Sequence, residues 1–320
     1  MKAIKWLKYG EPEHLKLEEI TKPIPKENEV LIKVKAASVN RTDCAIFYGK
    51  PFFMRFMTGL FKPKNMILGT EFSGIIEGVG NGINDFKVGD AVFGLNSNGL
   101  KSHAEYLVLS EKEAFTKKPS QLTFEEAAAC TEGAHYGLNF LNKIELKPGD
   151  KVLVNGATGG IGSATLQLAK YFGAEVTAVG NTKNLELLKS LGADNVINYE
   201  TEDFTKLDTA FDFIFDAVGK STFFKCKPLL KPKGVYISSE LGPWSQNIFL
   251  PIIGKFSSGK KVKFPLPLNI KESVMLVKKL MESGQMKPVI DRVYPIEKVG
   301  EAFTYVFAGQ KTGNVAIKIG

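Results

Sequence analysis

Closely spaced glycines between residues 156 and 162 form the segment of this sequence best suited to hold a phosphorylated ligand. The segment reads GATGGIG and follows a short apolar run. Relative to the dinucleotide-binding pattern G-x-G-x-x-G, Ala157 replaces the first glycine, whereas Gly159 and Gly162 keep their places. A glycine turn that opens a helix leaves backbone N–H groups free to bind a pyrophosphate. The predicted nucleotide-binding residues are Gly156, Ala157, Thr158, Gly159, Gly160, Ile161 and Gly162.

The residues on either side of this turn predict the elements that would position it. Val152, Leu153 and Val154 form an apolar run, as in a strand that is buried on both faces. Apolar residues within Gly160–Phe172 recur every three or four positions, which predicts a helix with one buried face. A second apolar strand follows at Glu175–Val179. A parallel strand–helix–strand unit favours nucleotide binding over the alternative, an ordinary tight turn.

The end of the second strand indicates which nucleotide is bound. Gly180, Asn181, Thr182 and Lys183 stand where the ribose of a dinucleotide is recognised. An acidic residue there would bind the ribose of NAD and repel an added phosphate, but this segment has no acid. Two small polar side chains and one cation suit a 2′-phosphate instead, so we predict NADPH as the cofactor. The alternative is that Lys183 only begins the next helix, predicted at Asn184–Leu191.

Length and composition limit the classes of protein to which the chain can belong. It has 320 residues, long for a single core, and its 44% hydrophobic and 24% charged residues are ordinary for a globular protein. No apolar run is long enough for a membrane span, and three widely separated cysteines argue against disulfides, so we expect a cytoplasmic protein. The net charge of +8 is scattered along the chain, and nucleic acid is not the expected main partner.

The pattern of strands and helices predicts two domains. Residues 1–122 are β-rich, and Thr123 is a predicted N-cap that marks the domain boundary. Residues 123–266 alternate strands and helices, which predicts a doubly wound parallel α/β sheet, the Rossmann fold. Residues 267–320 are expected to complete the first domain. The predicted strands include Glu29–Ala36, Glu71–Val79, Asp90–Phe93 and Ala104–Leu109, then Asn195–Asn198, Asp212–Phe215, Gly234–Ser238 and Lys261–Phe264. In the last segment we predict helices at Ile270–Met281 and Glu297–Phe307 and strands at Val289–Tyr294 and Asn314–Ile319.

Longer segments of the chain follow one another in the order of a known family. They are ASVNRTD (37–43), ILGTEFSGIIEGVG (67–80), FKVGDAVFG (86–94), LKPGDKVLVNGATGGIG (146–162), LKSLGADNVINY (188–199), FDFIFDAVG (211–219) and TGNVAIKI (312–319). With these segments the chain resembles the medium-chain dehydrogenase/reductase superfamily, and within it the zinc-independent NADPH:quinone oxidoreductase branch. The resemblance implies a GroES-like catalytic domain beside the Rossmann domain, a nicotinamide held between them, and a homodimer as a common assembly.

The resemblance also raises the question of a metal. Zinc-dependent relatives place a cysteine and a histidine where this chain has Asn40 and Thr70, and neither of these side chains is a good zinc ligand. Cys130 lies near the place of the third ligand, but one thiol cannot build a site. We therefore predict that no metal is bound.

Without a Lewis acid, oxidation of alcohols by the zinc mechanism is disfavoured, and reduction of an activated acceptor is the expected reaction. A quinone, or an alkene conjugated to a carbonyl, accepts hydride at carbon, and the oxyanion that develops needs only hydrogen-bond donors and a proton from water. We predict an NADPH-dependent quinone or enone reductase acting on a small molecule. The alternatives are a zinc-free alcohol or aldehyde dehydrogenase and a non-catalytic NADPH-binding sensor.

The resemblance places further residues near the cofactor. Asn40 would lie beside the nicotinamide and donate from its amide; the alternative is that it ties two loops together. Several relatives carry a tyrosine soon after the aspartate that matches Asp43, and here Tyr48 is the nearest, with a packing role as its alternative. His103 and His135 are expected to be structural, and the alternative is that they titrate near neutral pH. The remaining predicted contacts are Tyr199 at the adenosine 2′-phosphate, Val218 and Gly219 at the nicotinamide, and Ser238 and Ser239 at its carboxamide.

The segment Pro51–Phe61 (PFFMRFMTGLF) is rich in Phe and Met. A helix packed in the core explains this composition most simply, and a flexible apolar lid over a hydrophobic acceptor is the alternative.

Overall fold

The computed structural model describes residues 1–52, 54–64, 67–96, 100–253, 259–266 and 269–320. Its contacts divide the chain into two units. Unit 1 comprises Met1–Glu132, Ile270–Glu282 and Pro288–Gly320, and unit 2 comprises Gly133–Asn269 and Ser283–Lys287. In the described part of the chain, no helix is both long enough and apolar enough to cross a membrane.

Unit 2 is built on a six-stranded sheet with the order β10-β9-β8-β11-β12-β13, and all of its strands are parallel. Its central strands are apolar on both faces, and Val152, Leu153 and Val154 of β8 are completely buried. This doubly wound order confirms the predicted Rossmann fold. The strands are β8 (Lys151–Asn155), β9 (Glu175–Gly180), β10 (Asn195–Asn198), β11 (Phe211–Asp216), β12 (Leu230–Ser238) and β13 (Lys261–Lys263).

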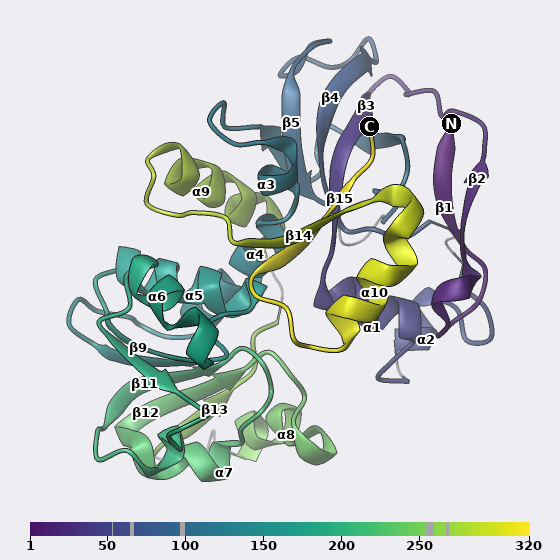
Figure 1. Ribbon diagram of the computed structural model, residues 1–320. Coiled ribbons are helices and arrows are strands. Elements are labelled where there is room, and N and C mark those ends of the chain that lie inside the picture. The colour runs from purple at the N-terminus through teal and green to yellow at the C-terminus, as the bar shows by residue number, and fades with distance from the viewer. Residues whose placement is uncertain (53, 65–66, 97–99, 254–258, 267–268) are drawn as a thin grey trace. The chain divides into compact units, whose positions relative to one another are not determined.

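Helices cover both faces of this sheet, with α5 and α6 on one face and α7 and α8 on the other (Figure 1). The central helix α5 is buried along most of its length, from Gly162 to Ala169, rather than on the single predicted face. Phe172 was expected on that face, but it lies just after the last residue of the helix, Tyr171, and is 39% exposed. The helices are α4 (Thr131–Leu141), α5 (Gly160–Tyr171), α6 (Leu185–Ser190), α7 (Phe223–Cys226) and α8 (Gln246–Ile253).

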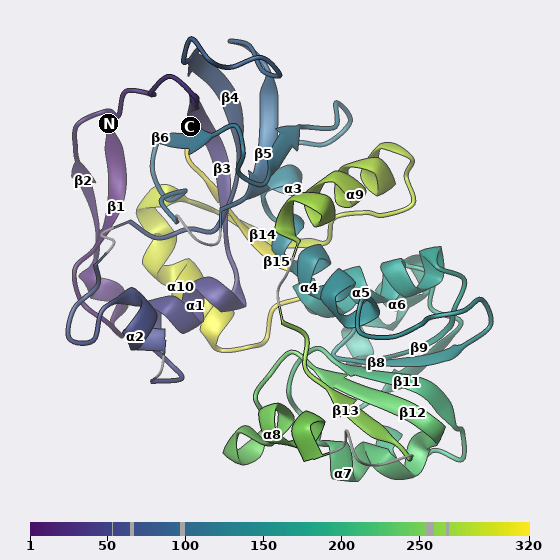
Figure 2. The same ribbon diagram turned by 180° about the vertical axis from the view of Figure 1, so that it is seen from behind.

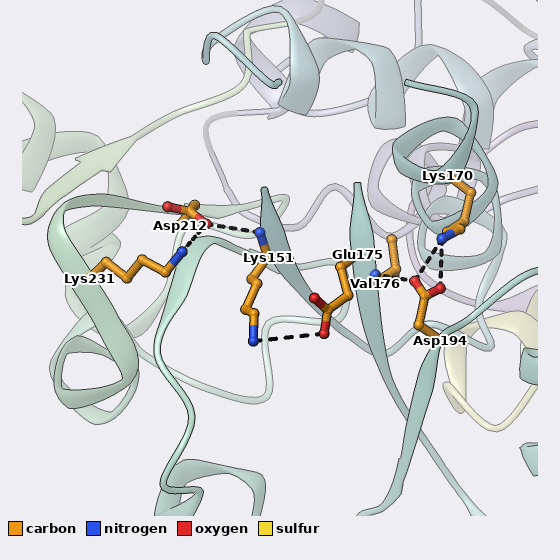
Figure 3. Close-up of polar contacts among 7 residues, drawn as sticks. All are labelled: Lys151, Lys170, Glu175, Val176, Asp194, Asp212 and Lys231. Atoms are coloured by element: carbon orange, nitrogen blue, oxygen red, sulfur yellow. Dashed lines mark hydrogen bonds and ion pairs between the residues drawn. The ribbon is translucent and has the colours of Figure 1, made fainter. Parts of the chain in front are cut away.

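Ion pairs and hydrogen bonds gather where the strands of this sheet begin (Figure 3). The Asp212 carboxylate accepts from the Lys151 backbone N–H at 2.8 Å and from Lys231 Nζ at 2.6 Å. Nearby, Lys170 Nζ lies 2.7 Å from the Asp194 carboxylate. Such partly exposed pairs contribute little stability. They pair polar groups at the edge of the sheet where the strands start. Ligands of such sheets bind at the opposite edge, where the strands end.

Unit 1 is β-rich. Its main sheet has the order β14-β15-β3-β4-β5-β7, with β6 pairing β3, and a separate hairpin pairs β1 with β2. The strand β15 runs antiparallel to β3, so that segments from the two ends of the sequence lie side by side (Figure 2). The strands are β1 (Lys2–Trp6), β2 (Leu15–Glu19), β3 (Glu29–Val39), β4 (Glu71–Val79), β5 (Ala91–Leu95), β6 (Tyr106–Ser110), β7 (Phe115–Lys117), β14 (Ile290–Pro295) and β15 (Asn314–Lys318).

The core of unit 1 joins this sheet to its helices. Trp6, Phe47, Phe72 and Phe303 are fully buried members of one hydrophobic cluster. The helices are α1 (Arg41–Tyr48), α2 (Met54–Thr58), α3 (Phe124–Ala128), α9 (Ile270–Glu282) and α10 (Val299–Phe307). Short 3-10 turns lie at Pro12–His14, Thr182–Asn184, Phe204–Lys206, Lys227–Leu229, Pro243–Ser245 and Ile296–Lys298 in the two units.

The helix α3 belongs to unit 1, although the sequence placed the domain boundary before it. Thr123 is the N-cap of α3, as predicted, and it forms a capping box with Glu126. The helix nevertheless packs on the β-rich sheet, where Ser73 Oγ donates to the Phe124 carbonyl at 2.6 Å. The division between the units therefore falls after Glu132 rather than at Thr123.

The prediction of a core helix at Pro51–Phe61 is wrong for the described residues of that segment. The short helix α2 forms within it, but Phe52, Phe56 and Phe61 are 60%, 66% and 89% exposed. Phe53 lies outside the described residues.

Candidate active and cofactor-binding site

The glycine turn joins the end of β8 to the start of α5 as predicted. Gly156 has a positive φ of +74°, and the Ala157 N–H donates to the Val179 carbonyl at 3.0 Å, which fixes the turn to β9. A Cβ added to Gly162 would lie 2.1 Å from the Gly156 carbonyl oxygen, so this glycine is required for close packing. A Cβ on Gly159 would meet nothing nearer than 3.6 Å. The turn is therefore packed at Gly162 and open at Gly159, where a ligand would approach.

Residues from neighbouring strand ends surround this turn. A Cβ added to Gly156 would lie 2.6 Å from Val218 Cβ, and one added to Gly180 would lie 2.9 Å from Thr158 Cγ2. The predicted cofactor contacts on β8, β9 and β11 thus meet at one edge of the sheet. The first N–H groups of α5 have no acceptors within the helix and face this edge. The structure brings together the glycine turn, Gly180 to Lys183, Tyr199, Val218, Gly219, Ser238 and Ser239 in unit 2.

A buried carboxylate, Asp216, connects the strand ends through hydrogen bonds. Asp216 Oδ1 accepts from Asn155 Nδ2 at 3.0 Å and from the Gly219 N–H at 2.9 Å. Its Oδ2 accepts from the Ser221 N–H at 3.1 Å and from the Tyr236 hydroxyl at 3.0 Å. Asp216 therefore fixes the loop that carries Val218 and Gly219 to strands β8 and β12. The sequence predicts a strand end here, but the role of Asp216 was not predicted.

The end of β12 supplies a second feature that suits a ligand. Ser238 pairs with Asp216 in the sheet, and the Ser239 N–H donates to the Asp216 carbonyl at 3.1 Å. The Ser239 hydroxyl oxygen is buried and has no hydrogen-bond partner among the described residues. A buried hydroxyl without a partner is costly unless a ligand or water satisfies it.

The end of β9 differs from the prediction in one respect. The sequence indicated a segment free of acid around Lys183, but the Glu200 carboxylate reaches it from the turn after β10. Glu200 accepts from the Thr182 N–H at 3.0 Å and from Thr182 Oγ1 at 2.5 Å. These hydrogen bonds, together with the charge of Lys183, lower the pKa of Glu200. Tyr199, beside it, is 54% exposed.

Asn40 lies in unit 1 and is engaged by its own neighbours. It is the N-cap of α1, where its Oδ1 accepts from the Asp43 N–H at 2.8 Å. Its Nδ2 donates to Thr70 Oγ1 at 2.8 Å and to the Glu71 carboxylate at 3.2 Å. These contacts match the loop-tying role. The role of Asn40 toward a substrate or cofactor stays a prediction.

Buried carboxylates next to Asn40 were not foreseen from the sequence. Glu71 accepts from Ser38 Oγ at 2.5 Å and from the Glu132 N–H at 2.6 Å. Glu132 in turn accepts from Thr42 Oγ1 at 2.6 Å. Burial, and then the charge of Glu71, raise the pKa of Glu132 to about 7. Burial likewise raises the pKa of Asp43 and that of Glu71. This cluster therefore holds protons at pH values where exposed carboxyls are ionised.

Tyr48 and the two histidines are packed among other side chains, and the catalytic role of Tyr48 stays a prediction. The Tyr48 ring centroid lies 4.1 Å from that of Phe307, and partial burial raises its pKa. Burial lowers the pKa of His103 to about 4, although its Nε2 lies 2.7 Å from the Ser38 carbonyl. Burial also lowers the pKa of His135 to about 4. Both values fit the structural role expected of these histidines rather than titration near neutral pH.

The two positions matched to zinc ligands carry the amide of Asn40 and the hydroxyl of Thr70, which form a hydrogen bond with each other. Cys130 Sγ lies 3.3 Å from the Ala127 carbonyl and 3.6 Å from Met281 Sδ, and burial strongly raises the pKa of its thiol. Among the described residues, no group of three or more His, Cys, Asp and Glu side chains could hold a metal ion.

Two family models match the chain. The model described as alcohol dehydrogenase GroES-like domain matches residues 26–123, and the one described as zinc-binding dehydrogenase matches residues 191–317. The chain is 35% identical to 2-methylene-furan-3-one reductase of Solanum lycopersicum, over 99% of this chain and 79% of the relative. It is 32% identical to the chloroplastic NADPH-dependent alkenal/one oxidoreductase of Arabidopsis thaliana, with the same coverage.

The structure of the quinone oxidoreductase from Coxiella burnetii superimposes with a TM-score of 0.88, at 30% identity, over 100% of this chain and 99% of that one. The GroES-like sheet and the doubly wound sheet together define a two-domain dehydrogenase fold. The chain belongs to the medium-chain dehydrogenase/reductase superfamily, and its full-length relatives include quinone and alkenal/one oxidoreductases. The family resemblance and the fold predicted from the sequence are thereby confirmed.

Proposed function

We propose that the protein is a zinc-independent, NADPH-dependent oxidoreductase that transfers hydride to a quinone or an α,β-unsaturated carbonyl compound. One observation carries this proposal: the open glycine turn of a Rossmann sheet in a chain that matches reductases of such acceptors over its whole length. The names of those relatives state their acceptors and, in one case, the use of NADPH.

The residues at the strand ends fit a nicotinamide dinucleotide. The first N–H groups of α5 suit a diphosphate, and Gly159 leaves the space through which it would approach. The Ser239 hydroxyl offers a buried polar group with no hydrogen-bond partner in the part of the chain that the structure describes, and Lys183 offers a cation for a 2′-phosphate. When bound, NADPH supplies the hydride, and the protein's part is to bind and orient it.

Zinc independence rests on the chemistry of the side chains in unit 1. Asn40 donates its amide N–H groups to Thr70 and Glu71, so these positions hold a hydrogen-bond network of the protein's own. Reduction of a conjugated acceptor needs no metal, because hydrogen-bond donors stabilise the oxyanion that forms as hydride arrives. A proton from water then completes the product.

Three buried cysteines are consistent with a reducing compartment, and we propose the cytoplasm. Cys44, Cys130 and Cys226 are all free thiols. Burial raises the pKa of Cys226 to about 11, which keeps it protonated and unreactive at neutral pH.

A screen of acceptors tests the proposed function directly. NADPH absorbance is followed with a quinone, an enone, a simple aldehyde and no acceptor, and NADP⁺ with a primary alcohol is tested in parallel, each with and without a chelator. We expect turnover with the quinone or the enone, unaffected by the chelator. Alcohol oxidation without reduction of either acceptor would instead indicate an alcohol dehydrogenase. Tight NADPH binding without turnover on any acceptor would indicate a sensor.

A further inference from the structure

The subsite expected to hold a 2′-phosphate is occupied by the protein's own carboxylate. Thr182 was assigned to that phosphate as one of two small polar side chains at the end of β9, and its backbone N–H is a second donor there. In the structure both donors bind Glu200, at 3.0 Å and 2.5 Å. A carboxylate is the nearest protein equivalent of a phosphate, since both are anions that accept several hydrogen bonds.

The turn after β10 fixes Glu200 in this position. Asn198 Nδ2 donates to Thr182 Oγ1 at 2.8 Å, and the Glu200 N–H donates to Asn198 Oδ1 at 3.1 Å. The Tyr199 N–H donates to the Gly180 carbonyl at 3.0 Å, which joins the ends of the two strands. Glu200 therefore bonds to Thr182 within a network that spans both strands, rather than as an isolated surface side chain.

The charges of Lys183 and Glu200 have opposite effects on the binding of an added phosphate. Lys183 attracts an added phosphate, and its field also lowers the pKa of Glu200, so the two charges act on each other. An ionised Glu200 would repel a dianionic phosphate and would compete with it for Thr182. The same carboxylate is a good acceptor for the 2′-hydroxyl of an unphosphorylated ribose.

We propose that Glu200 is a specificity-determining residue that occupies the 2′-phosphate subsite and must leave Thr182 when NADPH binds. Glu200 thereby weakens NADPH binding and favours NADH binding. The protein then prefers NADPH over NADH less strongly than it would if Lys183 were the only charge at this subsite. This inference rests on the proposed function, because it assumes that unit 2 binds a nicotinamide dinucleotide.

Calorimetry with the variant Glu200→Gln tests the inference, using NADPH, NADH and the fragments 2′,5′-ADP and 5′-ADP as titrants. The amide keeps the size of the side chain but removes its charge. We expect NADPH and 2′,5′-ADP to bind about tenfold more tightly than to the wild type, a change of about 1.4 kcal/mol. NADH and 5′-ADP should bind unchanged or a few-fold more weakly.

The matched control is Glu202→Gln, which removes the same charge from an exposed residue in the same turn. If both variants strengthen NADPH binding equally, a general effect of net charge explains the result and the inference fails. The inference alone also fails if Glu200→Gln leaves the ratio of NADPH to NADH affinity unchanged while both nucleotides bind. If neither nucleotide binds wild type or variant, the proposed function fails and the inference with it.

Discussion

Under the proposed function, two charged residues near the end of β9, Lys183 and Glu200, would determine how the protein distinguishes two cofactors that differ by one phosphate. Lys183 was found from the sequence because it follows a recognisable strand. Glu200 was missed, although a signal was present: in a doubly wound sheet the strand after β9 lies beside it, so the residues following the two strands meet. Thr182 and Glu200 are distant in the sequence, and the parallel pairing of β9 with β10 brings them together in the fold.

Removing the Lys183 side chain tests whether this cation attracts the 2′-phosphate. In Lys183→Ala we expect NADPH affinity to fall about tenfold, because the cation opposite the 2′-phosphate is lost, and NADH affinity to change less than about twofold. Titration calorimetry measures both. Lys189→Ala serves as the control, since Lys189 is an exposed cation of the neighbouring helix that pairs with Glu186. Equal losses for the two nucleotides would contradict the assignment of Lys183.

Asp216 gives a prediction about the support beneath the site. Asp216→Asn replaces one acceptor oxygen with an NH₂ group that faces the donors of Ser221 and Tyr236. We expect about 3 kcal/mol less stability in urea unfolding, because buried donors lose their acceptor. Asp212→Asn, on the same strand, removes a half-buried carboxylate and should cost less than about 1 kcal/mol. Similar losses in the two variants would show that Asp216 has no special structural role.

Among the helices and strands, the strand–turn–helix around the glycines was predicted closely because its signals are local. Apolar runs give the strands, and the glycines give the turn. The segment containing α2 was misjudged for the opposite reason: its composition fits a buried helix, but no local signal shows whether another element covers it. Exposed Phe52 and Phe61 are therefore a result of tertiary structure that periodicity does not reveal.

Two glycines of the turn have separable roles, which a pair of alanine variants tests. Gly162→Ala places a methyl group against the backbone of Gly156 and should cost about 3 kcal/mol of stability. Gly159→Ala meets no close neighbour, so stability should change by less than about 0.5 kcal/mol. The methyl group of Gly159→Ala would instead stand where the diphosphate approaches and weaken nucleotide binding about tenfold. Urea unfolding and calorimetry measure the two effects, and unaltered nucleotide binding by Gly159→Ala would exclude the turn as the diphosphate site.

In the molecule as a whole, the sequence predicted the Rossmann sheet and the strands of the main sheet of unit 1 apart from β7. It predicted neither the β1–β2 hairpin nor the acidic residues buried in unit 1. The acidic cluster of unit 1 draws Asp43, Glu71 and Glu132 from α1, β4 and the start of α4. No local sequence signal marks any of these residues as buried. The cluster forms only when segments distant in the sequence come together in the fold. The division after Glu132 was missed for a similar reason, because the packing of α3 on the β-rich sheet has no local signature.

This cluster predicts how stability depends on pH. The pKa of Glu132 is about 7 in the folded protein, above its ordinary value of 4.5, so the folded state keeps a proton that the unfolded state releases between these pH values. The contribution of Glu132 to stability therefore falls as pH rises from 4.5 to 7. Glu132→Gln removes this loss and can still accept from Thr42. We expect the variant's advantage over wild type in urea unfolding to grow by about 2 kcal/mol between pH 5 and pH 8.

The exposed acid Glu113 provides the matched variant for that measurement. Glu113→Gln removes an exposed acid of the same unit, and its stability is measured at the same pH values as the control. A profile for Glu132→Gln that runs parallel to wild type would show that Glu132 titrates as an ordinary surface carboxyl.

The pairing of β15 with β3 has a consequence for synthesis on the ribosome. Residues 133–269 are all translated before β15, so the doubly wound sheet can form while the other sheet still lacks a strand. Until β15 emerges from the exit tunnel, the β3 backbone from Ala36 to Val39 has no partner on that side. The nascent chain must therefore carry this open edge through the translation of the entire Rossmann unit, a period in which chaperones or neighbouring nascent chains compete for it.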